Sequence, residues 1–139
     1  MLVVLIVCSN HIGVSGAEAL ALYLIEVPES GIEVLKLSYN NIANEGFKAF
    51  AEALESNRSL RELTLKSNRA DEKGIVALGE SLYSNNTLQL LTLLGNSFNN
   101  NSARLFGELS RDRFPFTGLA TDLQIYVVDG EHLVADVKV

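Results

Sequence analysis

The chain has 139 residues, a formal net charge of −6 and a sequence pI of about 4.9. Apolar residues make up 47% and charged residues 20%, a composition typical of one globular domain. The acidic balance argues against a nucleic-acid partner, since phosphate binding requires a basic surface. No apolar run is long enough to cross a membrane. The opening MLVVLIV lacks the flanks of a signal peptide. A single cysteine, Cys8, cannot form an internal disulfide and indicates a reducing, intracellular environment.

Four units of about 28 residues follow one another, beginning near Leu2, Ile32, Leu60 and Leu88. Each unit has an apolar residue at its first, fourth, sixth and eleventh positions, or alanine at the eleventh, and glycine or serine at the fifteenth. An asparagine stands at the ninth position of each unit. These asparagines are Asn10, Asn40, Asn68 and Asn96.

Within each unit the apolar period changes from two to about 3.6 residues. Leucines such as Leu35 and Leu37 alternate as in a short strand, and Phe47, Phe50 and Leu54 recur at helical spacing. The candidate N-caps of the second and third helices are Asn44 and Asp71, and Asn57 and the pair Asn85-Asn86 fit the return loops. One unit cannot bury its apolar face alone. We therefore predict a curved α/β solenoid with parallel strands on the concave face and helices on the convex face.

The ninth-position asparagine comes where a strand has ended and a helix has not begun. Backbone groups in such a turn lack ladder partners, and a buried unpaired group costs about 1–3 kcal/mol. An asparagine side chain has both a donor and an acceptor for them. We predict a structural ladder of these four residues along the stacked turns.

The pattern L-x-x-L-x-L-x-x-N-x-I, which Leu35, Leu37, Asn40 and Ile42 exemplify, resembles the leucine-rich repeat in its long form. The repeat length resembles that of the ribonuclease-inhibitor-like subfamily. The resemblance implies a leucine-rich repeat solenoid in which residues 1–110 hold four repeats. Residues 111–139 then form a C-terminal segment that contains a β-hairpin.

The two ends of the predicted solenoid differ. At the start, Val4 and Ile6 are apolar where a solvated strand is normally polar, so we expect further repeats or a partner to cover this end. Near the other end, LQIYVV and EHLVADVKV flank Asp129-Gly130, which predicts a hairpin with a type I′ turn. We expect two apolar rows to face each other across it. These rows are Leu123, Ile125 and Val127, and Leu133, Ala135 and Val137.

This hairpin either caps the last repeat or docks on a partner. Its VVDG stretch and the following strand resemble the C-terminal region of an animal leucine-rich repeat protein associated with ciliated cells, germ cells and nucleoli. That resemblance implies a ciliary or cytoskeletal scaffold.

Residues that carry chemistry are sparse. His11 and His132 lie far apart in the sequence, and no phosphate-binding loop or metal-ligand spacing is present. No base stands at a known spacing from Cys8. We predict a non-enzyme with no metal and no cofactor.

Protein binding is the activity that the predicted fold supports. The third, fifth, seventh and eighth positions of each unit face the concave side and are free to touch a partner. The candidate partner-binding residues are Val4, Ile6, Lys36, Tyr39, Glu62, Lys66, Leu90 and Leu94. Tyrosine and apolar anchors within a polar surround are typical of interface hot spots. For Leu90 and Leu94, the alternative is that the C-terminal segment covers them.

We therefore predict an intracellular, non-enzymatic scaffold for protein–protein interactions, without a nucleic-acid or membrane partner. It would belong to a larger assembly, ciliary, axonemal or cytoskeletal, and a nuclear location stays open. Other proteins with this repeat regulate GTPases or act as inhibitors and sensors, and these remain the alternatives.

Overall fold

The computed structural model describes residues 3–29 and 31–136 of the chain. Four strand–turn–helix units lead into a short helix, a fifth strand and a hairpin. The four units are β1 (Val3–Ile6) with α1 (Gly13–Glu26), β2 (Ile32–Lys36) with α2 (Ala43–Ser56), β3 (Glu62–Thr64) with α3 (Glu72–Ser81), and β4 (Leu90–Thr92) with α4 (Asn100–Asp112). The remaining elements are α5 (Phe114–Thr117), β5 (Ala120–Thr121), β6 (Leu123–Val128) and β7 (Glu131–Asp136).

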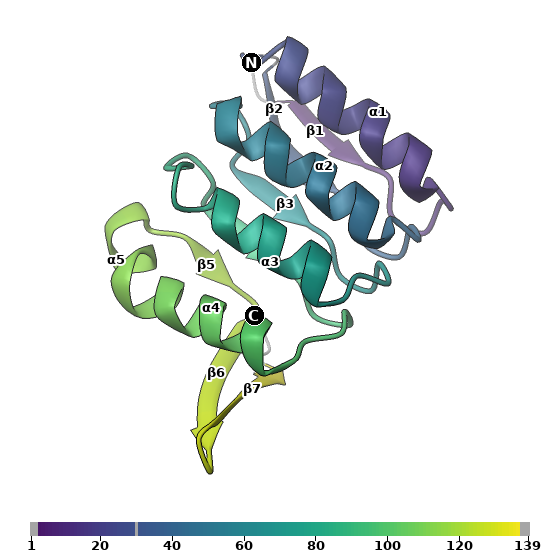
Figure 1. Ribbon diagram of the computed structural model, residues 1–139. Coiled ribbons are helices and arrows are strands. Elements are labelled where there is room, and N and C mark those ends of the chain that lie inside the picture. Colours follow the sequence, from purple (N-terminus) through teal and green to yellow (C-terminus); the bar gives the residue numbers. More distant parts are fainter. Residues whose placement is uncertain (1–2, 30, 137–139) are drawn as a thin grey trace.

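The strands form one parallel sheet in the order β1-β2-β3-β4-β5. Helices α1 to α4 lie side by side along one face of this sheet, and the β6–β7 hairpin extends beyond α4 (Figure 1). This arrangement confirms the predicted α/β leucine-rich repeat solenoid. The strand β5 lies beyond residue 110, so the C-terminal segment extends the parallel sheet as well as forming the hairpin. The division into domains at residue 110 stays a prediction.

The repeat period sets the strand register, because equivalent positions of successive units lie opposite each other. Leu35 pairs with Leu63, and Leu63 pairs with Leu91. All three side chains point toward the helices and are at most 1% exposed. Burying one leucine contributes about 1.5–3 kcal/mol. The stacked leucine rows therefore hold the sheet to the helix layer. Leu2, the predicted first position of the first unit, lies outside the described residues.

Glycine at the fifteenth position lets successive helices approach closely. A Cβ added to Gly46 would lie 3.0 Å from the Cβ of Ala17, and one added to Gly74 would lie 3.0 Å from the Cβ of Phe47. Real Cβ atoms essentially never come closer than this. A larger side chain at either position would push two neighbouring repeats apart.

One of the two predicted helix caps is confirmed. The Asp71 side chain accepts a hydrogen bond from the Lys73 N–H at 3.0 Å and caps α3. The prediction for Asn44 is wrong, because α2 already begins at Ala43. From inside the first turn, Asn44 Oδ1 instead accepts hydrogen bonds from the N–H groups of Asp71 and Gly74 in the next repeat.

The predicted hairpin and its turn are confirmed, but the predicted facing rows are wrong. Asp129 and Gly130 both have positive φ, 50° and 81°, as a type I′ turn requires. This two-residue turn places Val128 opposite Glu131, so odd-numbered residues of β6 face even-numbered residues of β7. Leu123, Ile125 and Val127 accordingly face Asp136, Val134 and His132, and not the predicted Leu133 and Ala135. The predicted Val137 lies outside the described residues.

The hairpin packs against the last long helix. Leu123 and Ile125 are partly buried against the core. The His132 N–H donates a hydrogen bond to Asn100 Oδ1 at 2.7 Å. The other face of the hairpin leaves Tyr126, Val128 and Leu133 between 41% and 47% exposed.

Candidate binding face and its polar scaffold

The ninth-position asparagines hold the turns at the carboxyl ends of the strands. Asn40 and Asn68 are completely buried. The Asn40 side chain donates to the carbonyl oxygens of Leu37 and Val7, at 3.0 and 2.7 Å. It therefore joins its own repeat to the preceding one. Asn68 does the same with Lys66 and Leu37.

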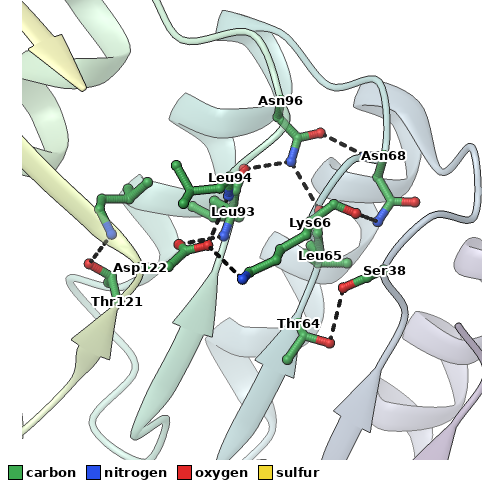
Figure 2. A network of polar contacts seen from close by, with 11 residues as sticks. Ser38, Thr64, Leu65, Lys66, Asn68, Leu93, Leu94, Asn96, Thr121 and Asp122 are labelled. Atoms are coloured by element: carbon green, nitrogen blue, oxygen red, sulfur yellow. Dashed lines mark hydrogen bonds and ion pairs between the residues drawn. The ribbon is translucent and has the colours of Figure 1, made fainter. Parts of the chain in front are cut away.

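The acceptor oxygens of these side chains complete a ladder. Asn40 Oδ1 accepts from the Asn10 N–H at 2.9 Å, Asn68 Oδ1 from the Asn40 N–H at 2.8 Å, and Asn96 Oδ1 from the Asn68 N–H at 3.0 Å. Figure 2 shows the rung that joins Asn96 to Asn68. Asn10 is exposed, and its side chain donates to Cys8 O within the same repeat. The ladder is thus strongest in the middle of the solenoid.

A second asparagine ladder, which the sequence analysis did not foresee, holds the return loops on the opposite side. Asn57 and Asn85 are 0% and 3% exposed. Asn57 donates to the carbonyl of Leu24 in the preceding repeat, and Asn85 donates to that of Leu54. Their Oδ1 atoms accept from backbone N–H groups three residues later. The sequence signal for this ladder is the spacing of 28 residues between Asn57 and Asn85, which equals the repeat period.

Asp122 closes the sheet at its C-terminal end, and the sequence analysis also missed this residue. In earlier repeats the N–H after each strand donates to a carbonyl of the next strand, as Leu65 does to Thr92 O at 2.9 Å. The equivalent N–H of Leu93 donates to Asp122 Oδ1 at 2.8 Å, and the Leu94 N–H to Asp122 Oδ2 at 3.0 Å. The carboxylate is completely buried and replaces the carbonyl groups of a further strand (Figure 2).

We call the face of the sheet opposite the helices the open face. Of the eight candidate partner-binding residues, five lie on strands, namely Val4, Ile6, Lys36, Glu62 and Leu90. The other three, Tyr39, Lys66 and Leu94, lie in the segments that follow β2, β3 and β4. Strand pairing arranges the strand residues in transverse rows. One row contains Val4, Val34, Glu62 and Leu90, and the next contains Ile6, Lys36, Thr64 and Thr92. Neighbouring members of a row are about 4.8 Å apart, as in any sheet. The structure thus brings residues 28 positions apart into one surface.

The open face is most exposed and most apolar at its N-terminal end. Ile6 is 61%, Val4 46% and Tyr39 60% exposed. Farther along, Lys36, Glu62 and Lys66 are intermediate in exposure. Leu90 and Leu94 are also intermediate in exposure. The face therefore offers an apolar end beside a polar middle.

Two polar contacts order the middle of this face. Ser38 Oγ donates to Thr64 Oγ1 at 3.4 Å, and Lys66 Nζ lies 3.9 Å from Asp122 Oδ2 (Figure 2). The Lys66 side chain is 43% exposed, so the ion pair is screened by solvent and contributes little to stability. Its ammonium is nonetheless drawn toward the C-terminal edge of the sheet.

Groups that could perform chemistry do not gather on this face. Within residues 3–29 and 31–136, no three His, Cys, Asp or Glu side chains are placed to hold a metal ion. Cys8 is half-buried, and His11 and His132 belong to opposite ends of the molecule. The carboxyls with lowered pKa values lie elsewhere. They are Asp71 and Glu72 at the beginning of α3 and Asp112 at the end of α4.

Asp71 and Glu72 link helix N-termini of neighbouring repeats, and this affects the stability at acid pH. The Lys73 N–H and the Asn44 amide lower the pKa of Asp71 below 3.8, and the amides of Asn101 and Asn99 lower the pKa of Glu72 below 4.5. A carboxyl whose pKa is lower in the folded state than in the unfolded state stabilises the fold fully at pH values above its unfolded-state pKa. This stabilisation is lost as the pH falls through its folded-state pKa.

We therefore expect the urea midpoint of the wild type to fall as the pH drops below about 4.5. The double variant Asp71→Asn/Glu72→Gln should lose less of its midpoint over the same interval, since it has no proton to bind at these sites. Urea titrations monitored by circular dichroism between pH 3 and pH 7 measure the difference. Equal slopes for the two proteins would show that these carboxyls are not linked to folding.

A parallel sheet with helices on one face and an open second face, built from units that repeat every 28 to 30 residues, defines a repeat solenoid. The leucine-rich repeat family model matches residues 1–21 and 32–51, so these two segments are similar to leucine-rich repeats in sequence. No curated protein is significantly similar to the chain in sequence.

Among solved structures, 35 chains are similar. One of them is actin-binding site 2 of leiomodin-1, with a TM-score of 0.60 and 21% identity. The match covers 75% of this chain and 61% of that one, so this chain spans less than two thirds of the leiomodin-1 domain. At this identity the likeness concerns the fold. Among the described residues, no helix is both long and apolar enough to span a membrane.

Proposed function

We propose that this chain is a non-enzymatic protein-binding module that holds a partner protein against its open sheet face. The observation that carries the proposal is the exposure of Val4 and Ile6 on strand β1 and of Tyr39 in the bend after β2. Exposed apolar side chains that cluster on one surface mark interaction sites more often than isolated ones do. Tyrosine is also enriched among the residues that dominate binding energy.

The arrangement suits a partner with two kinds of surface. The apolar end, at Val4 and Ile6, would receive an apolar anchor and exclude water around it. The polar middle, with Lys36, Glu62 and Lys66, would fix orientation through complementary charges. Two asparagine ladders hold the strands in place, so binding would need little ordering of the backbone.

For the biological setting, we propose a scaffold of an intracellular assembly, cytoskeletal or ciliary, in the ribonuclease-inhibitor-like subfamily. The resemblance of the VVDG tail supports the ciliary setting. The leiomodin-1 domain is an actin-binding site, and its likeness in fold makes actin the first partner to test. Neither nucleic acid nor membrane is a partner in this proposal, which the net charge of −6 supports.

Replacing Ile6 with glutamate should lower partner recovery at least tenfold, because a buried unpaired carboxylate costs more than about 1.4 kcal/mol. The tagged chain is used for pull-downs from ciliated tissue, with mass spectrometry, and for cosedimentation with actin filaments. Leu22→Glu is the matched control, since Leu22 is 52% exposed but lies on helix α1.

The two variants separate the open face from the helix face. Equal losses for both would mean that the partner does not use the open face. Recovery of a small GTPase whose hydrolysis the chain accelerates would favour the GTPase-regulator alternative. Recovery of a hydrolase that the chain blocks would favour the inhibitor alternative.

A further inference from the structure

We propose that the outer edge of β6 is a second docking site, where an extended basic segment of another protein adds a third strand to the hairpin. This site lies on a different element from the open face and goes beyond the function proposed above. Four observations carry it. They are the direction of the backbone groups of β6, its side chains, the groove beside it and the charge of the hairpin.

The hairpin register shows which backbone groups of β6 point outward. With a two-residue turn, Val128 and Glu131 exchange hydrogen bonds, and outward-pointing residues then alternate along both strands. On β7 this places the His132 N–H outward, and it indeed leaves the hairpin to bond Asn100 Oδ1. On β6 the same rule places the N–H and C=O groups of Ile125 and Val127 outward. Neither residue has a hydrogen bond outside the hairpin among the described residues.

The side chains of β6 do not protect this edge. Natural edge strands are commonly protected from pairing with another chain by lysine, by proline, by a bulge or by being very short. The strand LQIYVV has six residues, no charge and no proline, and its pairing with β7 runs without a bulge. Val127 and Val128 are 58% and 47% exposed. Such an edge is a template for strand addition.

A groove of about 490 Å³ lies between helix α4 and β6. It gives a third strand a surface to pack on, so that docking would bury side chains as well as pair backbone groups. Its lining includes Gly107, Ser110 and Arg111 of α4 and Leu123, Ile125 and Val127 of β6. Gly107 lets α4 approach β6 closely at the bottom of the groove, because a Cβ at this position would lie only 3.2 Å from Ile125 Cγ2.

Charge selects the occupant. From residue 114 to residue 136 the sequence contains four acidic residues and no lysine or arginine. Asp129 and Glu131 are exposed at the tip of the hairpin, whereas Asp122 is buried. A second copy would bring the same acidic hairpin and a net charge of −6, so self-pairing lacks complementary charge. In the groove lining, Arg111 is paired with Asp112 at 2.8 Å, and Glu108 adds a negative charge. A segment that alternates apolar residues with lysine or arginine therefore fits both the groove and the tip.

The test uses two short fluorescent peptides, one alternating valine with lysine and one alternating valine with glutamate. We expect fluorescence anisotropy to show binding of the lysine peptide to the full chain at least tenfold tighter than of the glutamate peptide. Hydrogen exchange followed by NMR should show new protection of the Ile125 and Val127 amides. Asp129→Asn/Glu131→Gln should reduce the preference for lysine, and asparagine keeps the turn because it tolerates positive φ.

Val127→Pro removes one outward N–H and should weaken lysine-peptide binding about tenfold or more. Val127→Ala keeps that N–H and is the matched control. An unchanged His132 amide signal shows that the hairpin of the proline variant is intact. Ile6→Glu should leave peptide binding unchanged, which separates this site from the open face.

Three results would overturn the proposal. One is that neither peptide binds the wild type. Another is that Val127→Pro binds the lysine peptide as tightly as Val127→Ala does, with its hairpin intact. The third is a concentration-dependent dimer, seen by sedimentation and abolished by Val127→Pro, which would make a second copy the occupant.

Discussion

Replacing Asn68 with alanine should lower the free energy of unfolding by about 2–4 kcal/mol, because several buried groups lose their partners at once. Asn68 Oδ1 accepts from the Asn40 N–H, and its Nδ2 donates to the carbonyls of Leu37 and Lys66. The side chain is completely buried, so bulk water cannot replace these bonds without opening the turn. In the variant, Leu37 O still accepts a hydrogen bond from Asn40 Nδ2. Because this carbonyl stays paired, we expect no larger loss of unfolding free energy.

Equilibrium unfolding in urea measures this loss, and Asn10→Ala is its matched control. Asn10 holds the same position of the repeat, but it is exposed and its side chain bonds only Cys8 O among the described residues. We expect the control to lose less than about 1 kcal/mol. Similar losses for the two variants would show that the intrinsic turn preference of asparagine, rather than bonding between repeats, stabilises the turns.

Replacing Asp122 with alanine should cost a similar 2–4 kcal/mol, although this residue lies outside the repeats. Its carboxylate accepts the N–H groups of Leu93 and Leu94, which lie beyond the last residue pair of β4 and β5. Hydrogen bonds to a charged group contribute about 1.5–3 kcal/mol each, and desolvation of the buried carboxylate offsets part of this. Asp122→Asn should fall between wild type and alanine, since its amide nitrogen would face one of the two N–H donors.

Hydrogen exchange locates the effect, because the Leu93 and Leu94 amides should lose protection in the Asp122→Ala variant before the amides of β2 do. Lys66→Met separates the ion pair from the amide contacts. The Lys66–Asp122 distance is 3.9 Å and the lysine is 43% exposed, so we expect a loss below about 1 kcal/mol. If Lys66→Met costs as much as Asp122→Ala, the ion pair rather than the closure of the sheet accounts for the role of Asp122.

Local patterns predicted the elements of this fold well. The alternation around Leu35 and Leu37 and the helical spacing of Phe47 and Phe50 both appear in the structure as expected. The dipeptide Asp129-Gly130 correctly indicated a type I′ turn. Each of these signals involves residues that lie close together in the sequence, within a single strand, helix or turn. Over such short distances, backbone preference and burial decide the conformation.

Errors arose where a side chain reached another element. Asn44 is a residue type that commonly caps helices, but it lies inside α2 and accepts hydrogen bonds from the next repeat. The facing rows of the hairpin differ by one residue from the expected ones, because the two-residue turn pairs odd-numbered residues of β6 with even-numbered residues of β7. Position along the chain could not reveal which partner a polar side chain would choose.

The repeat period alone predicts the parallel order of β1 to β4, because each unit buries its leucines by stacking on equivalent units. It could not foresee how the stack ends. Asp122 has the sequence neighbourhood of an ordinary surface aspartate, and its burial follows from β5 lying beside β4. The outward edge of β6 likewise follows from the hairpin turning away from the sheet. A repeating pattern describes the contacts that recur, whereas contacts made once, at an end, arise from packing between segments that share no pattern.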